Sequence, residues 1–114
     1  RFLLRAERCI SYHNEKKGDI QFPKWMDASW HNCIVGCMRC QMVCPQNKEV
    51  IKWTGEEEEF SEEETALLLE GVQRDKLPAT TLRKLERLSL VDYLDSLPRN
   101  LGVFFKKREQ PNFK

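Results

Sequence analysis

Four of the five cysteines in this 114-residue chain lie in the short stretch CIVGCMRCQMVCP, residues 33–45. Three of them follow the spacing Cys37-x2-Cys40-x3-Cys44-Pro45. Two cysteines three positions apart in a helical turn place their thiolates on one side of the backbone, whereas a cysteine four positions further on points its sulfur away from them. Pro45 has no amide hydrogen and stops a regular helix. We therefore expect Cys37 and Cys40 to bind one metal centre and Cys44 to serve a neighbouring one.

Iron–sulfur binding is the interpretation that this spacing favours, because it is the closing part of the bacterial ferredoxin pattern for [4Fe-4S] clusters. A second interpretation is a structural zinc site with four thiolates, formed by Cys9, Cys37, Cys40 and one of Cys33 or Cys44. Unliganded thiols are a third. A disulfide framework fits worst, because the number of cysteines is odd and nothing in the sequence suggests secretion.

Length and composition narrow the class of protein. Hydrophobic residues make up 40% of the chain and the net charge is +1. We therefore expect one folded domain with a modest core, and no general affinity for nucleic acid or an anionic membrane. No apolar run approaches a membrane span. Clustered thiols suggest a reducing, cytoplasmic setting. The chain starts at Arg1, and we expect it to be a piece of a longer protein.

The segment before the cysteine cluster contains the fifth cysteine. Residues 1–12 alternate between apolar and basic types, which suggests a short strand or an extended approach to the metal site. Cys9 has two interpretations. It is either a small buried hydrophobe, as free cysteines often are, or a remote ligand that completes the set begun by Cys37 and Cys40.

A polar stretch follows at residues 13–24. His13, next to Asn14, is expected to be a solvated loop residue rather than a ligand. Gly18-Asp19 predicts a turn.

Two tryptophans lie between this turn and the cysteines. Asp27 or Ser29 is expected to cap a short helical turn between them. Trp25 and Trp30 are expected to cover the metal site and exclude water from it, because a small core depends on large aromatic side chains.

The chain after the cysteines reads as an acidic linker and a set of helices. Residues 55–59 are GEEEE, and such a charge run is usually a solvated face. Ser61 and Glu64 form a capping box for a helix that ends near Gly71, with Phe60 packing before the cap.

Two further helical pieces are expected over residues 77–105. Thr80 or Thr81 is predicted to cap the first of them, and Pro98 to lie at the start of the second. The apolar residues along these helices are predicted to form the core.

These features predict a mainly α fold in three parts. Residues 1–54 form a partial ferredoxin-like iron–sulfur segment, 55–59 the acidic linker and 60–114 a helical C-terminal region against which the cysteine loop packs. No catalytic constellation stands out. Besides electron transfer and zinc binding, the acidic residues 55–70 leave open a third function, that of a helical protein-interaction domain.

The segments RCISY at residues 8–12, GCMRCQMVCP at 36–45 and Asn47-Lys48 together resemble epoxyqueuosine reductase and related proteins with a double [4Fe-4S] cluster domain. These are cytosolic, cobalamin-using reductases with a two-cluster ferredoxin-like module. The resemblance covers about a third of the chain, from Arg8 to Lys48. The helical residues 60–105 look like the tail of a double-cluster subgroup.

The resemblance implies which cysteine serves which cluster. Cys9, Cys37 and Cys40 would share one [4Fe-4S] cluster, and Cys44 would belong to a second. The first cysteine motif of such proteins lies upstream of RCISY, so an upstream part of the same protein would supply the remaining ligands. Cobalamin, a redox partner and tRNA would concern the full-length parent only.

Cys33 departs from the pattern of these proteins, which does not need a cysteine there. It is either a spare thiol or a fourth ligand that joins Cys9, Cys37 and Cys40. In an electron-transfer site the amide groups of residues 36–41 would face the cluster.

Several side chains are expected to adjust the site further. Arg39 would favour the reduced state. Apolar side chains would limit the access of water: Trp25, Trp30, Ile34, Met38 and Met42.

Overall fold

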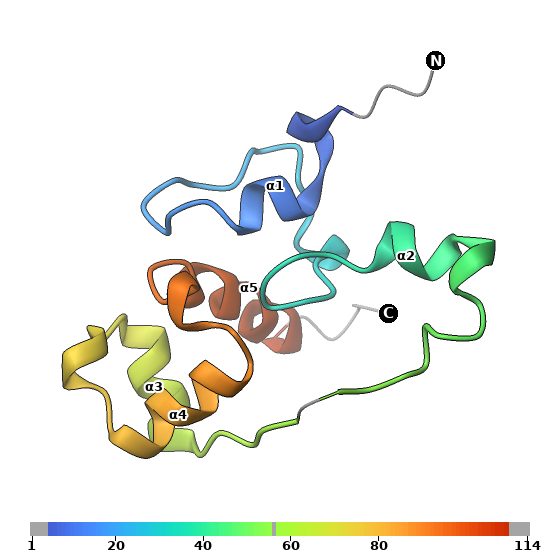
Figure 1. Cartoon of the computed structure of the whole chain (residues 1–114). Helices are drawn as coiled ribbons and strands as arrows, with labels where there is room; N and C mark the ends of the chain where they lie inside the picture. Colours follow the sequence, from blue (N-terminus) through green and yellow to red (C-terminus); the bar gives the residue numbers. More distant parts are fainter. Residues whose placement is uncertain (1–4, 56, 110–114) are drawn as a thin grey trace.

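The computed structural model describes residues 5–55 and 57–109, and all regular structure within these ranges is helical (Figure 1). The expected mainly α class is therefore confirmed. The alternative of a strand near the N-terminus is wrong for residues 5–12, which form a short 3-10 helix and the start of α1; residues 1–4 lie outside the described ranges. The side chains that α1 buries are polar, namely His13 and Asn14. The apolar residues before them therefore did not indicate the type of structure. No helix in the described ranges is long and apolar enough to cross a membrane.

The N-terminal half consists of very short helices joined by loops. They are η1 (Ala6–Arg8), α1 (Ile10–Asn14), η2 (Ala28–Trp30), α2 (Arg39–Val43) and η3 (Pro45–Asn47). Asp27 caps η2 as predicted, because its carboxylate accepts the amide hydrogen of Ser29 at 2.8 Å. Cys44 is extended, as a residue before proline prefers, and Pro45 then begins η3.

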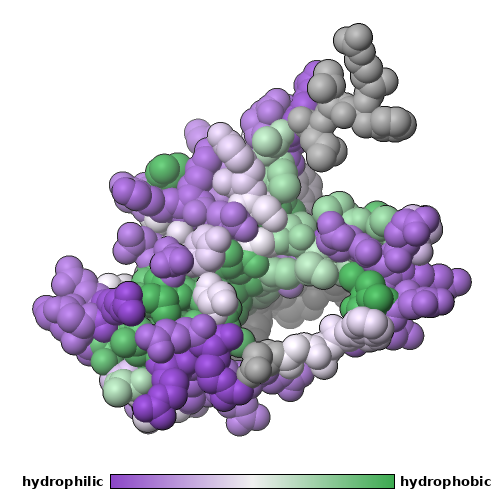
Figure 2. Space-filling model, in the orientation of Figure 1, coloured by the Kyte–Doolittle hydropathy of each residue, from purple (hydrophilic) through white to green (hydrophobic). Residues whose placement is uncertain are grey.

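The C-terminal half contains the hydrophobic core. Its helices are α3 (Glu62–Glu70), η4 (Arg74–Lys76), α4 (Ala79–Arg87), η5 (Val91–Tyr93) and α5 (Leu97–Glu109). Four leucines from this half are buried together: Leu68, Leu77, Leu85 and Leu97. Figure 1 shows α5 between α1 and the pair α3 and α4. Figure 2 shows hydrophilic residues over the α3–α4 end and apolar residues gathered in the middle of the same face.

Both ends of α3 lie where the sequence predicts them. The Ser61 hydroxyl accepts the amide hydrogen of Glu64, and the Glu64 carboxylate accepts that of Ser61, each at 3.1 Å. Gly71 ends the helix in the left-handed conformation at φ 82°. Phe60 packs against the core before the cap, as expected.

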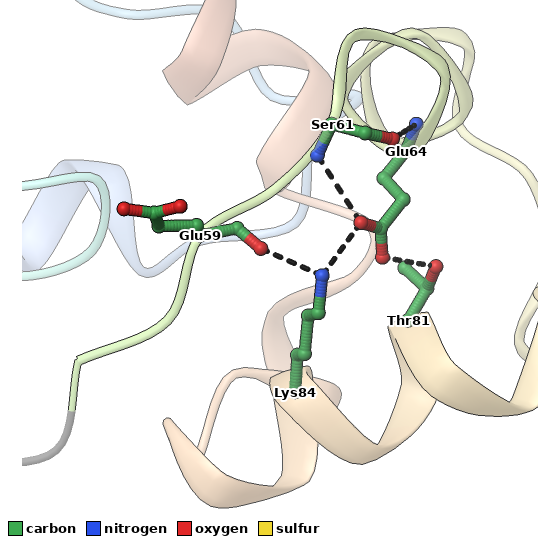
Figure 3. Close-up of polar contacts among 5 residues, drawn as sticks. All are labelled: Glu59, Ser61, Glu64, Thr81 and Lys84. Atoms are coloured by element: carbon green, nitrogen blue, oxygen red, sulfur yellow. Dashed lines mark hydrogen bonds and ion pairs between the residues drawn. The ribbon is translucent and has the colours of Figure 1, made fainter.

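The start of α4 differs from the prediction, because Thr80 and Thr81 lie inside the helix and Pro78 precedes it. The Thr81 hydroxyl is used differently: it donates to the Glu64 carboxylate of α3 at 2.6 Å. Lys84 donates to the same carboxylate and to the Glu59 carbonyl, both at 2.6 Å (Figure 3). Glu64 and Lys84 together therefore tie α3, α4 and the linker to one another.

The acidic linker is also held by α4. The Glu58 carboxylate lies 2.6 Å from the Arg87 guanidinium, and the Glu58 side chain is mostly buried. The expectation that the acidic run is a solvated face is therefore wrong at Glu58, whose carboxylate is paired with a cation of α4.

Glu64 should make the stability of the chain depend on acidic pH. Hydrogen bonds from Lys84, Thr81 and the Ser61 amide lower its pKa from 4.5 to about 2 in the folded state. A lowered pKa means that the stabilisation is complete above pH 4.5 and is lost as the pH falls toward about 2. We expect Glu64→Gln to lower the free energy of unfolding by about 2 kcal/mol near neutral pH, with a smaller difference at about pH 3. Urea unfolding at several pH values measures both.

The matched control for this experiment is Glu62→Gln, which removes a charge from an exposed position on the same helix. Its effect near neutral pH should stay within about 0.5 kcal/mol. A Glu64→Gln variant with the same pH profile as the unmodified chain would contradict the role of Glu64.

Candidate metal centre

The cysteine loop is held by the side chains of two buried asparagines. Asn14 donates to the Gly36 carbonyl at 2.6 Å and accepts the Gly36 amide hydrogen at 2.9 Å. Asn100 of α5 donates to the Ile34 carbonyl and to the Asn14 carbonyl, both at 2.8 Å. Gly36 adopts φ 83°, which favours glycine. The loop therefore packs against α5, as the sequence predicts.

Asn32 makes the hydrogen bonds closest to the thiols. Its side-chain nitrogen lies 3.1 Å from the Cys37 sulfur, and the Cys33 sulfur lies 3.3 Å from its side-chain oxygen. Cys33 and Cys37 are thus linked through one amide group. Burial raises the pKa of the Cys33 thiol, the charge of Cys37 raises it further, and the Met38 amide acts in the opposite direction.

The next two thiols lie on α2 and just after its end. Cys40 is exposed on this helix, and Cys44 is half-buried just after its end. Arg39, at the first position of α2, donates to the Trp30 carbonyl at 3.0 Å and to the Ser29 carbonyl at 3.4 Å. These bonds tie α2 to the turn formed by η2.

Two expectations about the N-terminal segment are wrong. Cys9 precedes α1 and is exposed, so it is not a buried small hydrophobe. His13 is buried rather than solvated: its ring nitrogen lies 2.7 Å from the Glu7 carbonyl, and its ring packs edge-on against Tyr12 and Trp25. A short helix buries His13, although its neighbours in sequence are polar.

The apolar side chains expected to limit the access of water are themselves exposed in this structure. Each is at least 38% exposed, and Met42 reaches 62%. Trp25 and Trp30 do pack on one another, with ring centroids 6.3 Å apart. The expected water-excluding cover of the metal site stays a prediction.

The cysteine thiols have the chemistry that an iron–sulfur cluster requires, but their arrangement in this structure does not form a complete site. All five cysteines are free thiols, the groups that bind such clusters. Within residues 5–55 and 57–109, however, no three cysteine, histidine or carboxylate side chains gather where they could hold a metal ion. The structure links Cys33 with Cys37 and does not join Cys9, Cys37 and Cys40 into one group. The residues fit a contribution to a cluster rather than a complete site.

The roles of three asparagines that organise the loop were not predicted from the sequence. Asn14 and Asn100 are almost fully buried. Asn100 lies between the apolar residues Leu97 and Leu101 of α5, and a polar residue in an apolar stripe was the available signal. No comparable signal marks Asn32.

Comparison with known proteins identifies relatives of part of this chain. It is 36% identical over 53 residues to an epoxyqueuosine reductase of Atelocyanobacterium thalassa (isolate ALOHA), a match that covers 46% of this chain and 17% of that protein. It is 34% identical over 55 residues to an epoxyqueuosine reductase of Prochlorococcus marinus (strain NATL2A), covering 48% and 18%. The chain thus matches about a sixth of the length of these curated relatives. No protein-family model and no solved structure matches the chain.

Proposed function

We propose that this chain is part of the iron–sulfur electron-transfer module of a larger, cytoplasmic, corrinoid-dependent reductase that resembles epoxyqueuosine reductase. Cys9, Cys37 and Cys40 contribute ligands to one [4Fe-4S] cluster, and Cys44 contributes to a second. The observation that carries the proposal is the Cys37-x2-Cys40-x3-Cys44-Pro45 spacing in a chain whose thiols are all free. The partial similarity to proteins named epoxyqueuosine reductase supports it.

The remaining ligands come from another part of the same protein in this proposal. Two observations support that division. The described residues do not gather three possible ligands, and Cys9 and Cys40 are exposed. The apolar side chains beside the cysteines are exposed as well, Met42 and Val43 most of all. An adjoining segment that covers these residues would also keep water from the thiolates.

The residues of this chain prepare the thiols for ligation. Asn14 and Asn100 hold the loop backbone, and Arg39 anchors the start of α2 to η2. When bound, a [4Fe-4S] cluster supplies one-electron redox chemistry whose potential depends on hydrogen bonds to sulfur, burial and nearby charge. A fixed loop and a nearby cation therefore favour a defined potential. The redox partner, a corrinoid and any tRNA substrate belong to the whole protein.

Metal analysis of the intact protein that contains this chain tests the proposal. After anaerobic purification we expect iron and acid-labile sulfide, with a brown colour. Cys37→Ser or Cys40→Ser should remove roughly half of both, because one of two clusters loses a ligand. Colourless protein with zinc and no iron would replace the proposal with the structural zinc interpretation. Iron that is unchanged in both variants would contradict the ligand assignment.

A further inference from the structure

The side-chain amide of Asn32 uses its whole hydrogen-bonding capacity. Its nitrogen donates to the Trp30 carbonyl and to the Cys37 sulfur, each at 3.1 Å. Its oxygen accepts the Met38 amide hydrogen at 2.8 Å and the Cys33 thiol hydrogen at 3.3 Å. A primary amide has two donors and two acceptor positions, so every one of them is occupied.

The backbone decides which way this amide faces. The amide hydrogen of Met38 can only donate and the carbonyl of Trp30 can only accept, so the oxygen must face Met38 and the nitrogen must face Trp30. An inverted amide would place its oxygen against the Trp30 carbonyl and its N–H against the Met38 amide. The orientation therefore places an N–H against the Cys37 sulfur and an oxygen against the Cys33 sulfur.

We propose that Asn32 selects Cys37 over Cys33 as the metal ligand of this loop; the inference rests on the proposed function. A cysteine binds metal as a thiolate, and an N–H donor stabilises the negative charge of that sulfur. The oxygen of the same amide instead takes up the S–H of Cys33 and opposes negative charge there. One side chain thus assigns different roles to two cysteines four residues apart, and Cys33 is the thiol that the cluster does not use.

The position of the amide is itself well defined. Its two backbone partners, Trp30 and Met38, lie on either side of the loop, and Arg39 also bonds to the Trp30 carbonyl. Asn14 holds the Gly36 backbone next to Cys37. Asn32 is therefore a positioning residue that acts through Cys37, and its effect should appear in properties that folding alone does not change.

The most direct variant is Asn32→Asp, which keeps the shape of the side chain and its acceptors for Met38 and Cys33 but removes the donors to Cys37 and to the Trp30 carbonyl. The matched control is Asn47→Asp. The Asn47 amide donates to the Gln41 carbonyl at 3.1 Å and to the Gln41 side chain at 2.6 Å, and no thiol is among these partners. Both variants make the same chemical change in the same half of the chain.

The first measurement uses the reduced, metal-free chain and follows iodoacetamide labelling of each cysteine by mass spectrometry, with Cys9 as the internal reference. The readout is the labelling rate of Cys37 divided by that of Cys33. The ratio of the two rates should fall at least about fivefold in Asn32→Asp, the effect of losing one hydrogen bond, and stay constant in Asn47→Asp. An unchanged ratio in Asn32→Asp, or an equal fall in both variants, would overturn the inference.

The second measurement uses the intact protein loaded with iron and sulfide. Cys33→Ser should leave the iron content unchanged. Asn32→Asp should lower the ratio of reduced to oxidised cluster at a fixed potential up to about tenfold, which is about 59 mV for a one-electron couple. Loss of iron in Cys33→Ser would overturn the assignment of Cys33. Protein without iron whose labelling ratio still falls as expected would overturn the proposed function and leave the distinction made by Asn32 in place.

Discussion

Replacing Arg99 with methionine is expected to lower the free energy of unfolding by about 4 kcal/mol, which is a large part of the stability of a small domain. The guanidinium is half-buried and donates to five backbone carbonyls of the N-terminal half at 2.5–3.1 Å. They belong to His13, Asn14, Lys16, Lys17 and Ile20. Methionine keeps an unbranched apolar stem but removes the charge and all five of these hydrogen bonds.

The position of Arg99 explains the size of the effect. Two of its partners, the carbonyls of His13 and Asn14, are at the C-terminal end of α1, where helical carbonyls lack intrahelical partners and a cation is favourable. The guanidinium also stacks on Phe22, with 4.3 Å from its central carbon to the ring centroid. Burial lowers the pKa of Arg99, an effect that Asp19 opposes. One side chain of α5 thus organises the segment that carries Asn14 and, through it, the cysteine loop.

Urea unfolding followed by circular dichroism measures this effect. The control is Arg83→Met, the same change at an exposed position of α4, which should stay within about 0.5 kcal/mol of the unmodified chain. Arg99→Lys should recover only part of the loss, because an ammonium group cannot reach several carbonyls in the fixed geometry of a guanidinium. A loss below about 1 kcal/mol in Arg99→Met would contradict this role of Arg99.

The features that the sequence predicts well are local. The capping box of Ser61 and Glu64, the helix end at Gly71 and the cap at Asp27 each depend on residues within a few positions of one another. Their chemistry is complete in a short window, so the window is sufficient to recognise them. The apolar residues along the C-terminal helices likewise predict the core, because burial follows helical periodicity.

Asn100, Arg99 and Thr81 have roles that depend on partners distant in the sequence. Asn100 bonds to Ile34, and Arg99 bonds to carbonyls about eighty positions away. A polar side chain in a short segment looks solvated until the fold supplies its partner. For the same reason the sequence predicts Thr81 as a possible helix cap, although its hydroxyl donates a hydrogen bond to Glu64 of α3.

In the candidate site, too, one feature could be predicted from the sequence and another could not. The spacing of the cysteines predicts the kind of metal chemistry, because it depends on local backbone geometry. It does not separate Cys33 from Cys37, since both are thiols in the same loop. That distinction comes from the orientation of the Asn32 amide, which the backbone of Trp30 and Met38 determines. Spacing identifies possible ligands, and the hydrogen bonds around each sulfur distinguish them.

Gly18→Ala is expected to be the second strongly destabilising change, with a loss of about 3 kcal/mol in the free energy of unfolding. The sequence predicts a turn at Gly18-Asp19, and the structure has one. The need for glycine has another cause, because the φ of Gly18 is not in the left-handed region. A Cβ atom there would overlap the backbone carbonyl of Asp95 and lie 3.5 Å from the Cα of Ser96.

Backbone cannot move aside as a flexible side chain does, so the loop and the start of α5 would have to separate. That separation would also strain the bond from the Ser96 hydroxyl to the Lys16 carbonyl, 2.5 Å long in this structure. The same substitution at Gly102, inside α5 with no atom within 4 Å of the added Cβ, is the matched control. It should raise stability by about 0.5–1 kcal/mol, because alanine favours a helix more than glycine does. If urea unfolding shows a loss of stability in Gly18→Ala and a gain in Gly102→Ala, close backbone contact joins the two halves. A change of the same sign in both variants would contradict this.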